Sequence, residues 1–172
     1  MKGMKFLVVA CAAATLCGCA SNYAWRPSTP EEMRTVSVPT FRNESDVQEA
    51  GAVAARQLLR EFQREGTFRI RATGDAALEV QGVVREGTSS TVAYDRRSGM
   101  RRSGSEFTLV AVVSVIDKRN GKILIDNRAY SGVTTFTSGH DLATARRDAA
   151  GRAADDLARQ VVDDILNFKW EK

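Results

Sequence analysis

The chain has 172 residues, of which 43% are hydrophobic, and its formal net charge is +4. This length fits one domain and is sufficient to bury a core without disulfides or structural metals. Lys2 and Lys5 lie in the N-terminal signal predicted below, and the residues after that signal carry about +2. The charge therefore gives no reason to expect nucleic acid as a partner.

An export signal is predicted over residues 1–18. Lys2 and Lys5 form its positive n-region, and the uncharged apolar run that follows is too short to span a bilayer. The signal ends in the letters LCGC at Cys19, which resemble a bacterial lipobox. We therefore expect Cys19 to carry lipid, palmitate included, as the mature N-terminus. The alternative is an ordinary secretory signal that is cleaved nearby.

A multiply acylated Cys19 would anchor the protein permanently, because stable anchoring requires more than one acyl chain. Ala20, and not Asp, follows Cys19, and this favours export to the periplasmic side of the outer membrane. Cys11 and Cys17 leave with the signal. No thiol then remains for a disulfide, a metal site or a cysteine nucleophile.

The remaining chain divides into a tether and one domain. Residues 19–33, with their prolines, are predicted to be a lipidated tether, and residues 34–172 a single domain. The domain begins with a short predicted strand over residues 34–39, ended by Pro39. A second strand is predicted over residues 68–72. The intervening helix makes a strand–helix–strand unit that suits a parallel crossover.

The first helix is predicted to start with Ser45 or Asp46 as its N-cap and to end near Glu65, before Gly66. Its buried stripe is expected to contain Val47, Gly51, Ala54, Leu58 and Phe62. A separate stripe contains Arg56, Arg60 and Arg64.

A third strand is predicted from Leu78 towards Tyr94, and a polar loop follows over residues 95–104. The loop holds four arginines within seven residues and no acid between them: Arg96, Arg97, Arg101 and Arg102. Guanidinium groups bind phosphates bidentately, so these side chains are the candidate ligand site. The alternatives are a loop that docks on a protein partner and a loop that is only solvated.

The longest strand pattern occupies residues 106–116, where apolar residues alternate with a second, more polar face. Asn120-Gly121 then predicts a tight hairpin turn in which both residues take positive φ. Residues 123–137 are expected to return as the partner strand, with a regular alternation from Ile123 to Ser131. An isolated hairpin is only marginally stable, so the helices must cover it.

The chain ends with a long helix predicted to open at residues 138–141 and to end near Phe168. Its buried stripe is expected to contain Ala145, Ala149, Ala153, Leu157, Val161 and Ile165. Acid–arginine pairs four residues apart mark its solvated face, for which no function is predicted. Together these patterns predict an α+β fold, a two-layer sandwich of two helices packed on one mixed sheet of four to five strands.

Patterns for catalysis are weak. His140 is the only histidine, and its place beside Asp141 at a helix start predicts a capping or surface residue. The carboxylates mostly have arginine neighbours at helical spacing, and the glycines fit neither nucleotide-binding fingerprint. We therefore predict a protein that is not an enzyme and holds no cofactor and no metal.

The lipobox and five later segments resemble, in their order, the LptE family of outer-membrane lipoproteins that assist lipopolysaccharide assembly. The segments are RTVSVPTFRNES from Arg34, LLREFQREGTFRI from Leu58, GDAALEVQGVV from Gly74, LVAVVSVIDKRNGKILIDNRAYSG from Leu109 and AADDLARQVVDDIL from Ala153. The fold that this resemblance implies is the two-layer sandwich described above.

The resemblance also implies a function. LptE proteins lie in the lumen of the LptD β-barrel as a plug, help the barrel to fold and bind lipopolysaccharide in transit. A 1:1 complex with LptD is therefore expected, with Arg96, Arg97, Arg101 and Arg102 as the expected contacts to lipopolysaccharide phosphates. The entry pattern V-x-V-P-x-F-x-N also occurs in lipoprotein activators of peptidoglycan synthases and in secretion components, and these functions remain the alternative.

Overall fold

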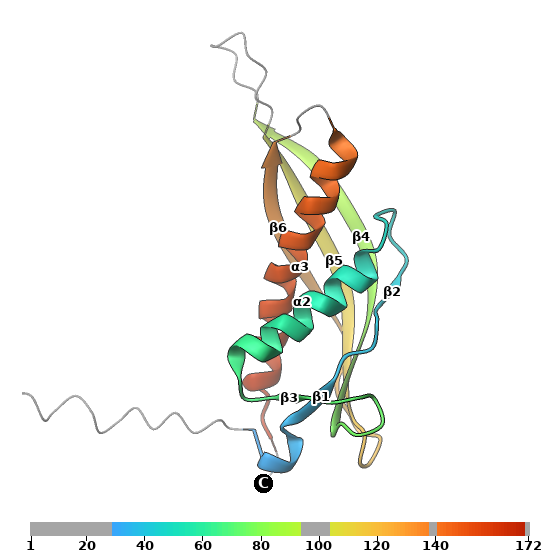
Figure 1. Ribbon diagram of the computed structural model, residues 1–172, viewed down its shortest axis with the longest axis vertical. Coiled ribbons are helices and arrows are strands. Elements are labelled where there is room, and N and C mark those ends of the chain that lie inside the picture. The colour runs from blue at the N-terminus through green and yellow to red at the C-terminus, as the bar shows by residue number, and fades with distance from the viewer. Residues whose placement is uncertain (1–28, 94–103, 138–140, 171–172) are drawn as a thin grey trace, which may run out of the picture.

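The computed structural model describes residues 29–93, 104–137 and 141–170, which form a sheet with two helices packed on one of its faces (Figure 1). The elements are η1 (Glu31–Met33), β1 (Thr35–Ser37), β2 (Arg42–Asn43), α2 (Ala50–Glu65), β3 (Arg69–Ile70), β4 (Leu78–Ala93), β5 (Gly104–Asp117), β6 (Ile123–Thr137) and α3 (Leu142–Leu166). The predicted α+β sandwich is confirmed. Its sheet has six strands rather than four to five, because the two-residue strand β2, which no sequence pattern predicts, also pairs with β4.

The sheet order is β3-β1-β4-β5-β6, and β2 pairs with β4 beside β1. The predicted parallel crossover is confirmed. Strand β1 precedes α2 in the chain, β3 follows it, and the two strands pair in parallel. The long strands β4, β5 and β6 form an antiparallel meander that extends along the long axis of the molecule (Figure 1). Both helices therefore pack on a sheet whose length comes from three strands.

The core lies between the helices and one face of this meander. The predicted alternation of β5 is confirmed: Phe107, Leu109, Ala111 and Val113 are fully buried, and the residues that alternate with them are partly exposed. Leu58 and Phe62 of α2 and Leu157 of α3 fill the same core, as their stripes predict. Each fully buried apolar side chain contributes about 1.5–3 kcal/mol to folding.

The predicted N-cap of the first helix is wrong. Helix α2 begins at Ala50, after Glu49 in a left-handed conformation, and not near Ser45 or Asp46. The Oγ atom of Ser45 instead accepts from the backbone N–H of Val47, and the Asn43 side chain donates to the Val47 carbonyl oxygen at 2.8 Å. These local bonds form a turn where the sequence predicts the first helical residues. The predicted end of the helix at Gly66 is confirmed.

The hairpin between β5 and β6 forms as predicted, but its turn differs. Only Gly121 of the Asn120-Gly121 pair has positive φ, at 73°. The Asp117 carboxylate accepts from the Arg119 backbone N–H, and the Gly121 N–H donates to the Asp117 carbonyl oxygen at 2.8 Å. The carboxylate thus stabilises a longer connection in place of the two-residue turn.

The regular alternation predicted for β6 is wrong, and its largest departure follows Ile125. Val115 pairs with Ile125 and Val113 with Arg128, so β6 carries one extra residue here. Asn127 lies in this bulge with φ 43°, and its N–H donates to the Ser114 Oγ atom. The extra residue moves the following positions to the other face, and Tyr130 is consequently buried.

Side chains of helix α3 also form hydrogen bonds with backbone groups at the outer edge of β6. Asp156 accepts from one backbone N–H of β6 at 3.2 Å, while Gln160 and Arg152 donate to two carbonyl oxygens at 2.8 and 3.4 Å. These backbone groups belong to Val133, Ser131 and Thr135, respectively. Four helical residues rise about 6 Å and two strand residues about 6.6 Å, so the two repeats match over this length.

Candidate functional site

The arginine loop that the sequence predicts as a ligand site lies outside the described residues. Its flanking residues Ala93 and Gly104 pair with each other, so the loop connects the ends of β4 and β5. Thr137 pairs with Gly104 and lies at the same end of the sheet. Cys19 and His140, the other residues singled out by the sequence, also lie outside the described residues.

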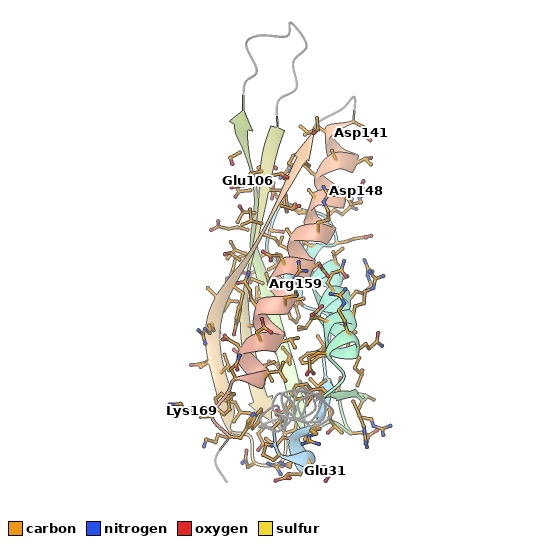
Figure 2. All side chains as sticks on the ribbon, turned by 90° about the vertical axis from the view of Figure 1, so that its left-hand side faces the viewer. Glu31, Glu106, Asp141, Asp148, Arg159 and Lys169 are labelled. Carbon is orange, nitrogen blue, oxygen red and sulfur yellow. The ribbon has the colours of Figure 1, made fainter. Side chains whose placement is uncertain are left out.

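The structure shows a different arginine-rich site, which we name the α2–α3 groove. It is an open depression of about 800 Å³ between the two helices, also bordered by the edge of β6. Six arginines line it: Arg56, Arg60, Arg64, Arg147, Arg152 and Arg159. The lining carboxylates are Asp148, Asp155 and Asp156, which leaves an excess of three positive charges. Arg159 and Asp148 are labelled on α3 in Figure 2.

The arginines come from the two helices. Arg56, Arg60 and Arg64 recur every four residues, so each lies about 6 Å further along α2. All three are exposed, as expected for the face opposite Leu58. Arg152 and Arg159 of α3 belong to the acid–arginine pairs that predict a solvated face, whereas no predicted pattern includes Arg147. The sequence did not show that these arginines lie opposite those of α2.

The positive charge of the groove is unevenly neutralised. Asp155 lies 3.2 Å from the Arg159 guanidinium and 3.9 Å from that of Arg64, so it joins the two helices. Arg64 also contacts Glu61 at 2.6 Å. Among the described residues, Arg56 forms no ion pair. Arg147 forms no direct ion pair either, but its charge reaches the Asp141 carboxylate, whose pKa is lowered mainly by hydrogen bonds from Thr144 and also by Arg147. The groove therefore keeps guanidinium groups that are available to an external anion.

Gly151 lies where the helices come close together. Its carbonyl oxygen accepts from the Gln57 side chain at 3.2 Å. A Cβ atom built on Gly151 would meet nothing within 4 Å. The absence of a side chain at this position therefore leaves the groove open, and a side chain added there would enter free space.

A second charged cluster lies at the β5–β6 turn. Arg119 donates to both carboxylate oxygens of Asp117 at 3.1 Å, and these hydrogen bonds lower the pKa of the buried Asp117 carboxyl. Lys118 pairs with Glu79 at 3.2 Å. These carboxylates are already paired within the fold, so the cluster has a structural role.

Among the described residues, no group of three or more His, Cys, Asp or Glu side chains could hold a metal ion. The tyrosine with a perturbed pKa, Tyr130, donates to Asp164 at 2.7 Å, and burial raises its pKa. Neither described helix has the length and apolar composition required to cross a membrane.

Helices on one face of a mixed sheet, with a polar groove between them, define a two-layer α+β domain that offers surfaces for binding. The family model for LptE, lipopolysaccharide-assembly, matches residues 33–165. The chain therefore belongs to the LptE family, and this membership places it among the envelope lipoproteins of lipopolysaccharide assembly. No curated protein sequence matches it significantly.

Solved structures share the fold at low sequence identity. A Chlamydia trachomatis protein has a TM-score of 0.53 at 11% identity, over 78% of this chain and 96% of its own. A Xanthomonas campestris protein has a TM-score of 0.53 at 13% identity, over 84% and 88%. A predicted lipoprotein from Caulobacter crescentus CB15 has a TM-score of 0.50 at 18% identity, over 74% and 88%. These similarities show the fold alone.

Proposed function

We propose that this protein is an outer-membrane lipoprotein that plugs the LptD β-barrel, assists its assembly and binds lipopolysaccharide during transport to the outer leaflet. The family match over residues 33–165 carries this proposal. The role needs binding surfaces rather than a catalytic centre. A lipidated Cys19 at the end of a tether would hold the domain on the periplasmic side.

The sheet face opposite the helices is the surface that we assign to the barrel wall. Thr108, Val110 and Val112 project from this face of β5 and remain partly exposed, and no described element covers them. Val133 of β6 is 44% exposed and pairs with Thr108. A broad face of β-branched side chains suits contact with another protein surface.

Affinity purification from detergent-solubilised outer membrane tests the proposal. The expected result is a 1:1 complex with a large β-barrel. Val112→Lys should reduce this copurification, because it places a charge on the assigned face, whereas the β-branched control Val112→Thr should retain it. Recovery of a peptidoglycan synthase instead of a barrel would reject the proposal in favour of an enzyme regulator.

We also propose that Arg96, Arg97, Arg101 and Arg102 contact lipopolysaccharide phosphates. Support comes from the density of guanidinium groups in this loop and from the anionic character of the ligand. The pairing of Ala93 with Gly104 holds the two ends of the loop together at one end of the meander.

A further inference from the structure

The α2–α3 groove has the chemistry of an anion site. Three exposed arginines from α2 lie opposite three from α3, and three aspartates neutralise only part of their charge. Guanidinium groups prefer anions that accept two parallel hydrogen bonds, such as phosphates. We infer that this groove binds the phosphate groups of a ligand that carries at least two of them.

The spacing of the cations favours more than one phosphate. Arg56, Arg60 and Arg64 extend over about 12 Å along α2, which exceeds the reach of a single phosphate. Arg147 and Arg152 lie about one turn or less from Gly151 on α3. The Gly151 carbonyl oxygen accepts from the Gln57 side chain of α2, so these arginines lie near the contact between the helices. A ligand with two or more phosphates can therefore contact both helices without displacing the Asp155 bridge.

The open volume supports a ligand larger than an inorganic ion. The groove encloses about 800 Å³, and no side chain projects from Gly151 into it. Two sources share this phosphate chemistry: a phosphorylated glycolipid and a free polyphosphate. The glycolipid as natural source rests on the proposed function, whereas the binding of phosphate itself does not.

Gly151 allows a test in which only charge changes. Gly151→Glu would place a carboxylate in the groove, and Gly151→Gln would add nearly the same volume without the charge. The purified full-length protein in detergent would be titrated with sodium tripolyphosphate, with bis-phosphorylated lipid A and with dephosphorylated lipid A. Arg56→Gln combined with Arg147→Gln gives a second test, with the exposed Arg71→Gln as its control.

The wild type should bind tripolyphosphate and phosphorylated lipid A, more weakly as salt rises. Gly151→Glu should bind at least about tenfold more weakly than Gly151→Gln, which accounts for the added volume, and the double arginine variant should bind at least about tenfold more weakly than wild type. Arg71→Gln, outside the groove, should stay within about twofold of wild type. Binding of tripolyphosphate alone would make a free anion the source and keep the groove as a phosphate site.

Equal affinities of Gly151→Glu and Gly151→Gln would overturn the inference, because charge would then not determine binding. Equal binding of phosphorylated and dephosphorylated lipid A, without binding of tripolyphosphate, would also overturn it. Copurification of the barrel with the wild type reports separately on the proposed function. If no barrel copurifies, that function is rejected, whereas the phosphate-binding measurements still test the groove.

Discussion

A Cβ atom at Gly132 would lie 1.8 Å from the carbonyl oxygen of Ala153, so α3 packs directly on the backbone of β6. No rotamer change can relieve this contact, because the obstructing atom belongs to the helix backbone. The close approach also brings the polar side chains of α3 within reach of the edge of β6. Gly132 therefore determines how α3 docks.

Gly132→Ala should destabilise the fold by about 1–3 kcal/mol, because the helix must move away from the strand. Gly151→Ala is the matched control: its Cβ would meet nothing within 4 Å, and alanine is about 0.5–1 kcal/mol better than glycine inside a helix. Urea denaturation of both variants checks this. Equal stabilities would contradict the docking described above.

Removing the side chains of Asp156 and Gln160 should expose the edge of β6. The double alanine variant loses hydrogen bonds worth about 1 kcal/mol each and leaves unpaired backbone groups that can pair with another strand. We expect a lower melting temperature and concentration-dependent self-association in sedimentation velocity. Asp163→Ala removes an exposed acid from the same helix and should remain like wild type. Failure of the double variant to self-associate would show that these bonds do not protect the edge.

Asp117 should contribute to stability in a pH-dependent way. Hydrogen bonds from Arg119 lower its pKa in the folded state, so the unfolded state binds this proton more tightly. The contribution is therefore fully present above about pH 4 and is lost as pH falls through the lowered folded pKa. Asp117→Asn should cost about 1–2 kcal/mol at pH 7.

Denaturation curves at pH 7, 5, 4 and 3 check this dependence. The difference between wild type and Asp117→Asn should stay constant down to about pH 4 and then narrow. A difference that is independent of pH would show that the Arg119 contact does not stabilise the ionised carboxylate.

Replacement of Arg96, Arg97, Arg101 and Arg102 by serine should weaken lipopolysaccharide binding more than tenfold, since each good charge-assisted contact is worth about 1.5–3 kcal/mol. The melting temperature should change little, because the loop connects strand ends. Titration with purified lipopolysaccharide at several salt concentrations measures the effect. Reduced copurification with LptD and normal lipopolysaccharide binding would instead assign the loop to the barrel.

Cys19→Ala should abolish palmitate labelling and release the protein from fractionated outer membrane, unless the barrel retains it. Labelling with radioactive palmitate reports on lipidation. Fractionation of cells with and without the barrel partner separates retention by the lipid anchor from retention by the barrel. Palmitate that still labels the variant would show that the lipobox prediction is wrong.

Features that depend on local periodicity could be predicted from the amino-acid sequence. The alternation from Phe107 to Val115 indicated which face of β5 is buried, and the stripe through Leu58 and Phe62 indicated the buried face of α2. Gly66 marked the end of that helix. These features depend on the side-chain periods of strands and helices, which a linear pattern carries.

The way in which these elements pack together could not be predicted from local patterns. The bulge at Asn127 buries Tyr130, because one extra residue reverses the alternation without any hydrophobic signal of its own. The α2–α3 groove likewise depends on the packing of two helices separated by three long strands. Arg56 belongs to a stripe that, taken alone, describes ordinary solvated surface, and no predicted pattern includes Arg147. Their side chains line one groove because both helices pack on the same face of the sheet, with α3 close to the backbone of Gly132.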